Sequence, residues 1–329
     1  MGMTFRGTGR TAASRVAISA ALAAVAGCAA PQRIAPPPQE APLPDARSVT
    51  VLRGEPAEPP AAWSELIAAA RAADVFVIGE NHGHRLGLSV AAAIWDDVLD
   101  GAPDAALALE FFERDQQACI DDYLAGLTDE ATFKRMARRN DNNYPAGHRA
   151  MLEYAKSADV PVIAANSPRV YVRAASREGF DRLLELTPEQ RRLFRVPDEL
   201  PAGRYREDFE RVMTGNADAH GDGAASQPAS TRPSLDGPFR AQSVWDWTMA
   251  ESVSRALQAG RRPVLLVVGR FHSDFRGGLI QALERLTPGV RVLTLSFVNE
   301  TSDVLREEDQ HRADFVIYVG PSEPPERGS

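Results

Sequence analysis

Two segments far apart in this chain share one pattern, in which an apolar run is followed by glycine, two further residues and histidine. The first run is Val75–Ile78, followed by the Gly-Glu-Asn-His of Gly79–His82; the second is Val264–Val268, followed by the Gly-Arg-Phe-His of Gly269–His272. Continuous aliphatic runs predict strands buried on both faces, as in a parallel sheet. Because open parallel sheets bind ligands beyond the carboxyl ends of their strands, the two histidines are predicted to share one site.

Polar residues also end two other predicted strands. Glu110 closes the run Ala105–Glu110, Asn166 closes Val160–Asn166, and Arg169 follows three residues later. Side chains at the carboxyl ends of parallel strands meet at one edge of the sheet, so a carboxylate, an amide and a guanidinium are expected beside the histidines.

These residue types allow two kinds of chemistry. Two histidines and a carboxylate can bind a divalent metal such as zinc or manganese, or can act as general base and general acid. The sequence therefore predicts His82, Glu110 and His272 as metal ligands, and these three with Glu80 as catalytic residues. The alternative stays open that each is a cap or a solvated residue, since polar residues normally begin where strands end.

The elements that must position these residues alternate along the chain. Strands are predicted at residues 75–78, 105–110, 160–166, 264–269, 292–297 and 315–319, and helices at about 86–99, 145–158 and 241–259. Alternating strands and helices predict an α/β fold with a doubly wound, mostly parallel sheet flanked by helices. We expect one α/β domain over residues 61–320, with a small helical subdomain at about 167–213, a disordered Gly/Ala/Ser/Pro-rich loop at about 214–237, and a flexible tail at 321–329.

The N-terminus has the pattern of a bacterial lipoprotein signal. Three arginines precede the apolar stretch Val16–Ala26, which is too short to span a bilayer, and Gly27 then precedes Cys28. The pattern resembles a lipobox, which implies a signal peptide over residues 1–27 and acylation of Cys28, for example with palmitate. Ala29 by the same resemblance favours the outer membrane. The alternative is ordinary cleavage nearby that leaves Cys28 as a free thiol.

Composition limits the remaining choices. Residues 28–60 are rich in proline and alanine and predict an extended tether from the membrane. Removal of residues 1–27 with their three arginines lowers the formal net charge from −8 to about −11, which argues against nucleic-acid binding. With Cys28 acylated, Cys119 is the one remaining cysteine, so no intramolecular disulfide forms; its neighbours indicate a buried helix position.

The motifs together resemble the ChaN-like haem-binding lipoproteins of the EreA/ChaN and Tiki/TraB superfamily. The segments that carry this resemblance are Val77–His82, Leu107–Gln117, Asp121–Gly126, Val162–Arg169, Gln242–Glu251 and Gly269–His272. The resemblance implies a parallel sheet with flanking helices, and a lipoprotein tied to iron or haem acquisition. The wider superfamily contains metal-dependent proteases and erythromycin esterase-like hydrolases, whose paired histidine motifs and glutamate correspond to His82, Glu110 and His272.

Two functions follow as expectations. The first is an envelope-anchored haem carrier, on the outer membrane and facing the periplasm, with a second copy or an outer-membrane haem receptor as partner. Tyr144 and His148, one helical turn apart, are the predicted axial ligands, with Asn166 and Arg169 also in contact with the cofactor. Haem would be held non-covalently, because the chain has no Cys-x-x-Cys-His motif. The second function is a metal-dependent hydrolase that acts on a small-molecule, ester or peptide substrate.

Overall fold

The computed structural model describes Gly2 and residues 45–218 and 234–321. Cys28, the predicted signal peptide and most of the predicted tether lie outside these residues. The same holds for 219–233, within the predicted loop, and for 322–329, the predicted tail.

A seven-stranded sheet forms the centre of the fold. Its strands are β1 (Leu52–Arg53), β2 (Val75–Glu80), β3 (Ala106–Glu113), β4 (Val162–Asn166), β5 (Val264–Gly269), β6 (Val292–Val298) and β7 (Phe315–Tyr318). The order across the sheet is β1-β7-β6-β2-β5-β3-β4, and every neighbouring pair is parallel except β1 with β7. The predicted α/β class with a mostly parallel sheet is therefore confirmed, and β2 and β5, which end in the two histidine motifs, are direct neighbours.

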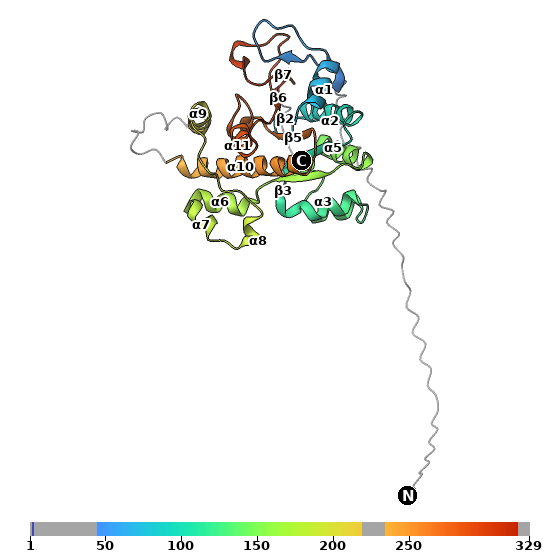
Figure 1. Cartoon of the computed structure of the whole chain (residues 1–329), viewed down its shortest axis with the longest axis vertical. Helices are drawn as coiled ribbons and strands as arrows, with labels where there is room; N and C mark the ends of the chain where they lie inside the picture. Colours follow the sequence, from blue (N-terminus) through green and yellow to red (C-terminus); the bar gives the residue numbers. More distant parts are fainter. Residues whose placement is uncertain (1, 3–44, 219–233, 322–329) are drawn as a thin grey trace, which may run out of the picture. The chain divides into compact units, whose positions relative to one another are not determined.

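Helices cover both faces of the sheet (Figure 1). They are α1 (Trp63–Ala72), α2 (Arg85–Leu99), α3 (Gln117–Leu124), α4 (Glu130–Met136), α5 (Ala146–Ser157), α6 (Arg169–Glu178), α7 (Phe180–Leu184), α8 (Pro188–Arg191), α9 (Arg204–Asp218), α10 (Asp236–Gln258) and α11 (Gly278–Leu286), with short 3₁₀ turns η1 (Ala46–Ser48), η2 (Arg114–Gln116), η5 (Arg270–His272) and η6 (Glu307–Asp309). Helices α6 to α9 occupy the range where a small helical subdomain was expected.

The sheet is buried on both faces because successive strand residues point to opposite sides. Phe76 and Ile78 of β2 join the apolar core formed with α1, α2 and α5, whereas Val75 and Val77 join the core formed with α10 and α11. All six residues of β2 and all six of β5 are buried. Two fully buried strands side by side give the ends of these strands, and hence the motif residues, a rigid support.

Two predicted boundaries need correction. Leu52 and Arg53, within the range predicted as a tether, belong to the folded domain, because Leu52 is 4 % exposed and β1 pairs with β7. The predicted loop is also shorter than expected, since α9 continues to Asp218 and α10 begins at Asp236. By contrast, Cys119 is buried in α3, as the sequence predicts.

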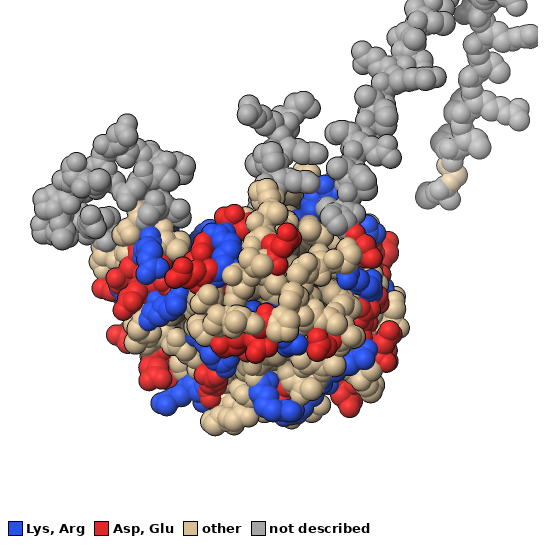
Figure 2. All heavy atoms as spheres, turned by 90° about the horizontal axis from the view of Figure 1, so that it is seen from above, with Lys and Arg blue, Asp and Glu red and all other residues tan. Residues whose placement is uncertain are grey.

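Within the described part of the chain, no helix combines the length and the apolar character needed to cross a bilayer. The face seen in Figure 2 carries acidic and basic side chains interspersed among uncharged ones.

Candidate functional site

The polar residues at the strand ends meet at one edge of the sheet and line two adjoining cavities. The larger cavity has a volume of about 710 Å³, and the smaller one about 450 Å³. Both are lined by the same five residues that the sequence singled out, Glu80, His82, Glu110, Asn166 and Arg169. His148 lines the larger cavity and His272 the smaller one.

Gly269, at the end of β5, allows His82 and Glu110 to approach each other. A Cβ atom at this position would lie 3.0 Å from His82 Nε2 and 3.4 Å from Glu110 Oε2. The Gly269 N–H donates to Glu110 Oε2 at 2.6 Å, which fixes the carboxylate. The glycine of the second motif, Gly269, therefore leaves room for the ring of His82, the histidine of the first motif.

His82 is the accessible imidazole of the site. Its side chain is 71 % exposed, while the side chain of Glu80, 3.1 Å from His82 Nδ1, is 5 % exposed. The hydrogen bond to Glu80 raises the pKa of His82 to about 9, with a further contribution from the charge of Glu110. Because Nδ1 is engaged by the carboxylate, Nε2 is the nitrogen left for a metal, and with the pKa at about 9 a metal that binds there at neutral pH would displace its proton.

His272 is buried in a polar chain that reaches α9 and α10. Its Nδ1 lies 2.5 Å from Asp246 Oδ1, and the Tyr205 hydroxyl donates to Asp246 Oδ2 at 2.8 Å. On the other side, His272 Nε2 lies 3.7 Å from Glu110 Oε1. Burial lowers the pKa of His272, but the carboxylates of Asp246 and Glu110 outweigh burial, so the pKa is raised overall.

The two predicted axial ligands lie in different surroundings. His148 is 2 % exposed, stacks on Phe111 with ring centroids 4.3 Å apart, and places Nε2 3.8 Å from Glu80 Oε1. Burial lowers the pKa of His148, so its imidazole is neutral at physiological pH. Tyr144 instead packs in an aromatic cluster with Phe111, Phe112 and Phe133, and burial raises the pKa of its hydroxyl.

The residues predicted as metal ligands do not form a metal site. Among the described residues, no group of three or more His, Cys, Asp or Glu side chains is arranged to hold a metal ion. One donor atom of each of two predicted ligands already has a partner within the protein: His272 Nδ1 contacts Asp246, and Glu110 Oε2 accepts a hydrogen bond from the Gly269 N–H. The zinc or manganese site predicted from the sequence is therefore not supported.

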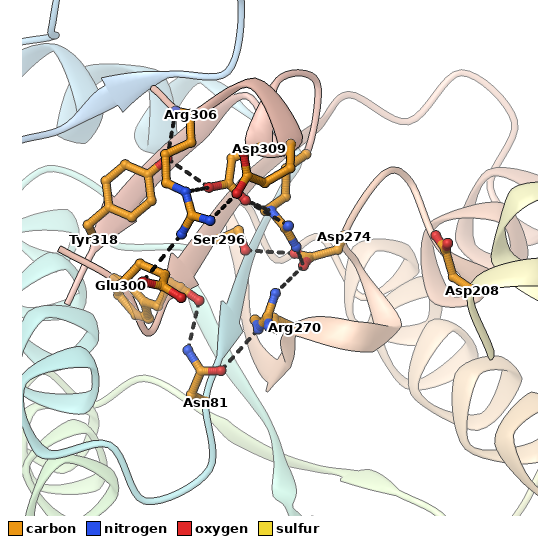
Figure 3. A network of polar contacts seen from close by, with 12 residues as sticks. Asn81, Asp208, Arg270, Asp274, Ser296, Glu300, Arg306, Asp309 and Tyr318 are labelled. Atoms are coloured by element: carbon orange, nitrogen blue, oxygen red, sulfur yellow. Dashed lines mark hydrogen bonds and ion pairs between the residues drawn. The ribbon is translucent and has the colours of Figure 1, made fainter. Parts of the chain in front are cut away.

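A polar network connects the two histidine motifs to the C-terminal segment (Figure 3). Arg270 of the second motif donates from Nε to Asn81 Oδ1 of the first motif at 3.0 Å, and pairs with Asp274 at 3.0 Å. Asp274 accepts a hydrogen bond from Ser296 at 2.6 Å and pairs with Arg312, which also pairs with Asp309. The side chains between the histidines are thus fixed by contacts that reach β6 and the turn η6.

Three residues that the sequence did not single out take part in the site or support it. The carboxylate of Asp246 is fully buried and binds His272. Glu113 ends β3 and lines the larger cavity, and the Arg114 side chain, 8 % exposed, pairs with Glu251 at 2.9 Å. A single acidic residue between two tryptophans was the signal that could have identified Asp246.

Comparison with known proteins identifies the family. Residues 66–283 match the family model described as haem-binding uptake, Tiki superfamily, ChaN. The chain belongs to this family. No match was found among curated proteins.

One solved structure shares the fold, and two others have lower similarity. A structure of ChaN from Campylobacter jejuni, which concerns cofacial haem binding, has a TM-score of 0.62 at 13 % identity and covers 84 % of this chain and 98 % of that one. The type III effector HopBA1 has a TM-score of 0.44 at 13 % identity, covering 85 % and 100 %. A mutant of erythromycin esterase EreC in its open conformation has a TM-score of 0.44 at 11 % identity, covering 85 % of each chain.

Proposed function

We propose that this ChaN-family protein binds haem non-covalently in the cavity of about 710 Å³ and takes part in haem uptake at the bacterial envelope. The observation that carries the proposal is the composition of one cavity wall, which combines two imidazoles, an aromatic ring and several arginines. The cavity volume lies in the range of cofactor sites, roughly 300–1,000 Å³. Haem iron needs a nitrogen, oxygen or sulfur donor beside an apolar wall, and His82, His148 and Phe111 provide such a set.

We place the iron ligand at His82. Histidines that bind metals commonly donate their other ring N–H to a carboxylate, which fixes the orientation of the ring, and the contact between His82 Nδ1 and Glu80 has this form. His148 is a less accessible donor, since it is 2 % exposed, but its Nδ1 is buried without a hydrogen-bond partner in the described structure. The buried hydroxyl of Tyr144 is the least suited of the three, because iron binds a tyrosinate and burial raises the pKa of this group.

A haemin titration followed by Soret absorbance tests the proposal. His82→Ala should weaken haem binding by more than about tenfold, since it removes the donor atom. A matched control is His311→Ala, because His311 is also exposed and also lies beside a glutamate, 3.3 Å from Glu55, yet lines neither cavity. Equal Soret titrations for the two variants would remove His82 from the role, and no Soret shift with the wild type would remove the function.

The proposal includes the location of the protein in the cell and its partners. Acylation of Cys28 would hold the protein on the outer membrane, facing the periplasm, where haem arrives through a receptor. A second copy of this chain is a further proposed partner. Measuring the oligomeric state of the protein with and without haem would test this pairing.

A second candidate function is acid–base hydrolysis in the smaller cavity without a metal. It is favoured by the pairing of His272 with a fully buried carboxylate, Asp246, while Nε2 faces Glu110. A carboxylate behind a histidine orients the ring and stabilises its charged form. Hydrolysis of ester or peptide substrates that is lost in His272→Ala and kept in His311→Ala would support this candidate.

A further inference from the structure

Three arginines line the larger cavity together with the histidines, and none of them is a candidate ligand of the iron. Arg138 and Arg139 follow α4, and Arg169 begins α6, so two segments far apart in the chain bring three guanidinium groups to the same cavity. Glu113, at the end of β3, is the acidic residue beside them.

Arg139 lacks an ionic partner within the described part of the chain. Its guanidinium lies 3.9 Å from the centre of the Phe111 ring and donates from Nη2 to the Phe111 carbonyl, and its Nε is buried without a hydrogen-bond partner. Burial lowers the pKa of Arg139 and outweighs the opposing charge of Glu113, and the charges of Arg138 and Arg169 lower it slightly further. A partly buried guanidinium that meets a ring, a carbonyl and like charges is stabilised by an anion.

The other two arginines are accessible and incompletely neutralised. Arg169 is 75 % exposed, and its Nε is 3.9 Å from Glu113 Oε1, too long for a good hydrogen bond. Arg138 is 64 % exposed and pairs at 2.6 Å with Asp115, which does not line the cavity.

We propose that Arg138, Arg139 and Arg169 form a carboxylate-binding subsite that recognises the two acid groups of a tetrapyrrole ligand. The inference rests on the proposed function and extends it from the iron to the periphery of the ligand. Guanidinium groups bind carboxylates through paired, charge-assisted hydrogen bonds, which give orientation as well as affinity. Haem bound in this cavity would present its acid groups to the arginines and its iron to His82.

Three probes separate this subsite from the iron site. Haemin has both iron and free acids, metal-free protoporphyrin IX has the acids alone, and haemin dimethyl ester has iron with the acids blocked. Wild type should bind protoporphyrin IX, measured by porphyrin fluorescence, and should bind the dimethyl ester roughly 10- to 100-fold more weakly than haemin, since charge-assisted hydrogen bonds are lost.

The variants are Arg139→Gln and Arg169→Gln, with Arg135→Gln as the matched control. Arg135 is exposed on the same helix that precedes Arg138, and it does not line the cavity. Both test variants should lose roughly 10- to 100-fold in affinity for haemin and for protoporphyrin IX while their affinity for the ester changes little, and the control should bind all three probes as wild type does. Because the Arg169 side chain is exposed, Arg169→Gln remains informative if Arg139→Gln fails to fold.

The outcomes are distinguishable. If haemin binds wild type but the ester binds equally well and both variants match the control, the subsite is wrong and haem binding stands. If haemin produces no Soret shift but protoporphyrin IX still binds in an arginine-dependent way, the subsite stands and the iron site is wrong. If neither haemin nor protoporphyrin IX binds, both proposals fall.

Discussion

Single residues decide whether the strand ends can come together. Gly269 has φ −54° and ψ 128°, a conformation open to any residue, so its glycine is needed for space and not for backbone freedom. Gly269→Ala would place a methyl group 3.0 Å from the His82 ring, and relieving such overpacking costs about 1–3 kcal/mol. We expect the His82 ring to move, with weaker haem binding and a small loss of stability.

The measurement is a haemin titration beside thermal unfolding, with Gly87→Ala as the control. Gly87 lies in α2, where an added Cβ meets Phe297 at 3.4 Å, near ordinary contact. Haem affinity unchanged in Gly269→Ala would mean that the His82 ring is not held at this position when the ligand binds.

His148 predicts how stability depends on pH. Burial lowers the pKa of this residue below the unfolded value of 6.5, so between the two values the unfolded chain binds more protons than the folded one. Its contribution to stability is therefore complete above pH 6.5 and is lost as the pH falls below that value. In His148→Gln this part of the decline should disappear, as measured by denaturant unfolding of the haem-free protein between pH 5 and 7.5. Parallel pH profiles for the variant and the wild type would contradict this account.

At the scale of elements, Asp274 joins the loop after β5 to β6 and to the C-terminal segment (Figure 3). Its side chain is 9 % exposed and pairs with Arg270 and Arg312, so Asp274→Asn removes the carboxylate that faces Arg270 and leaves Arg312 with Asp309 alone. Breaking a buried ion pair in this way costs roughly 3–5 kcal/mol. We expect a loss of that order in denaturant unfolding, together with weaker haem binding, because Arg270 also holds Asn81 beside His82.

The control for this prediction is Asp198→Asn. Asp198 has a half-exposed side chain and pairs with Arg195 at 2.6 Å. Ion pairs at the surface contribute about 1 kcal/mol or less to the free energy of unfolding. Similar losses in the two variants would show that the network has no special role in connecting the motifs.

Elements with a local signal were predictable, and those that depend on distant partners were not. The runs that became β2 and β5 are continuously apolar, so the sequence alone indicates buried parallel strands. The strand β1 has two residues and exists because Leu52 pairs opposite Val316, far away in the chain. In the same way, the histidines at the strand ends were predictable, whereas the contact between Asp246 and His272 depends on how α10 packs over the sheet.

Side-chain direction was also beyond the sequence. The sequence predicts one helical turn between Tyr144 and His148, but α5 begins at Ala146, so Tyr144 precedes the helix. Tyr144 stacks on Phe111 at 5.9 Å within the aromatic cluster, while His148 lines the cavity. Which residue of such a pair reaches a cavity depends on the neighbouring strand β3, and a periodicity argument does not contain that information.

At the scale of the whole molecule, the cavity residues are far along the chain from Cys28, so the predicted anchor and the proposed haem site can be tested separately. Asp45 caps η1, and the buried residues Val51 and Leu52 follow soon after it. The site residues all lie beyond residue 79, within the part of the chain that matches the ChaN family. Haem affinity should therefore not depend on how the N-terminus is attached.

Cys28→Ser tests the attachment. If Cys28 is acylated, this substitution should move the protein from the membrane fraction to the soluble envelope fraction. Stable anchoring needs more than one acyl chain, and a serine at this position would carry none. The released protein should bind haemin with wild-type affinity, since the cavity is built from other residues. Cys119→Ser is the control, because Cys119 is a buried thiol in α3 and should leave membrane partitioning unchanged. Membrane retention of Cys28→Ser would remove the lipoprotein proposal, and release with loss of haem binding would mean that the site needs the membrane or a partner there.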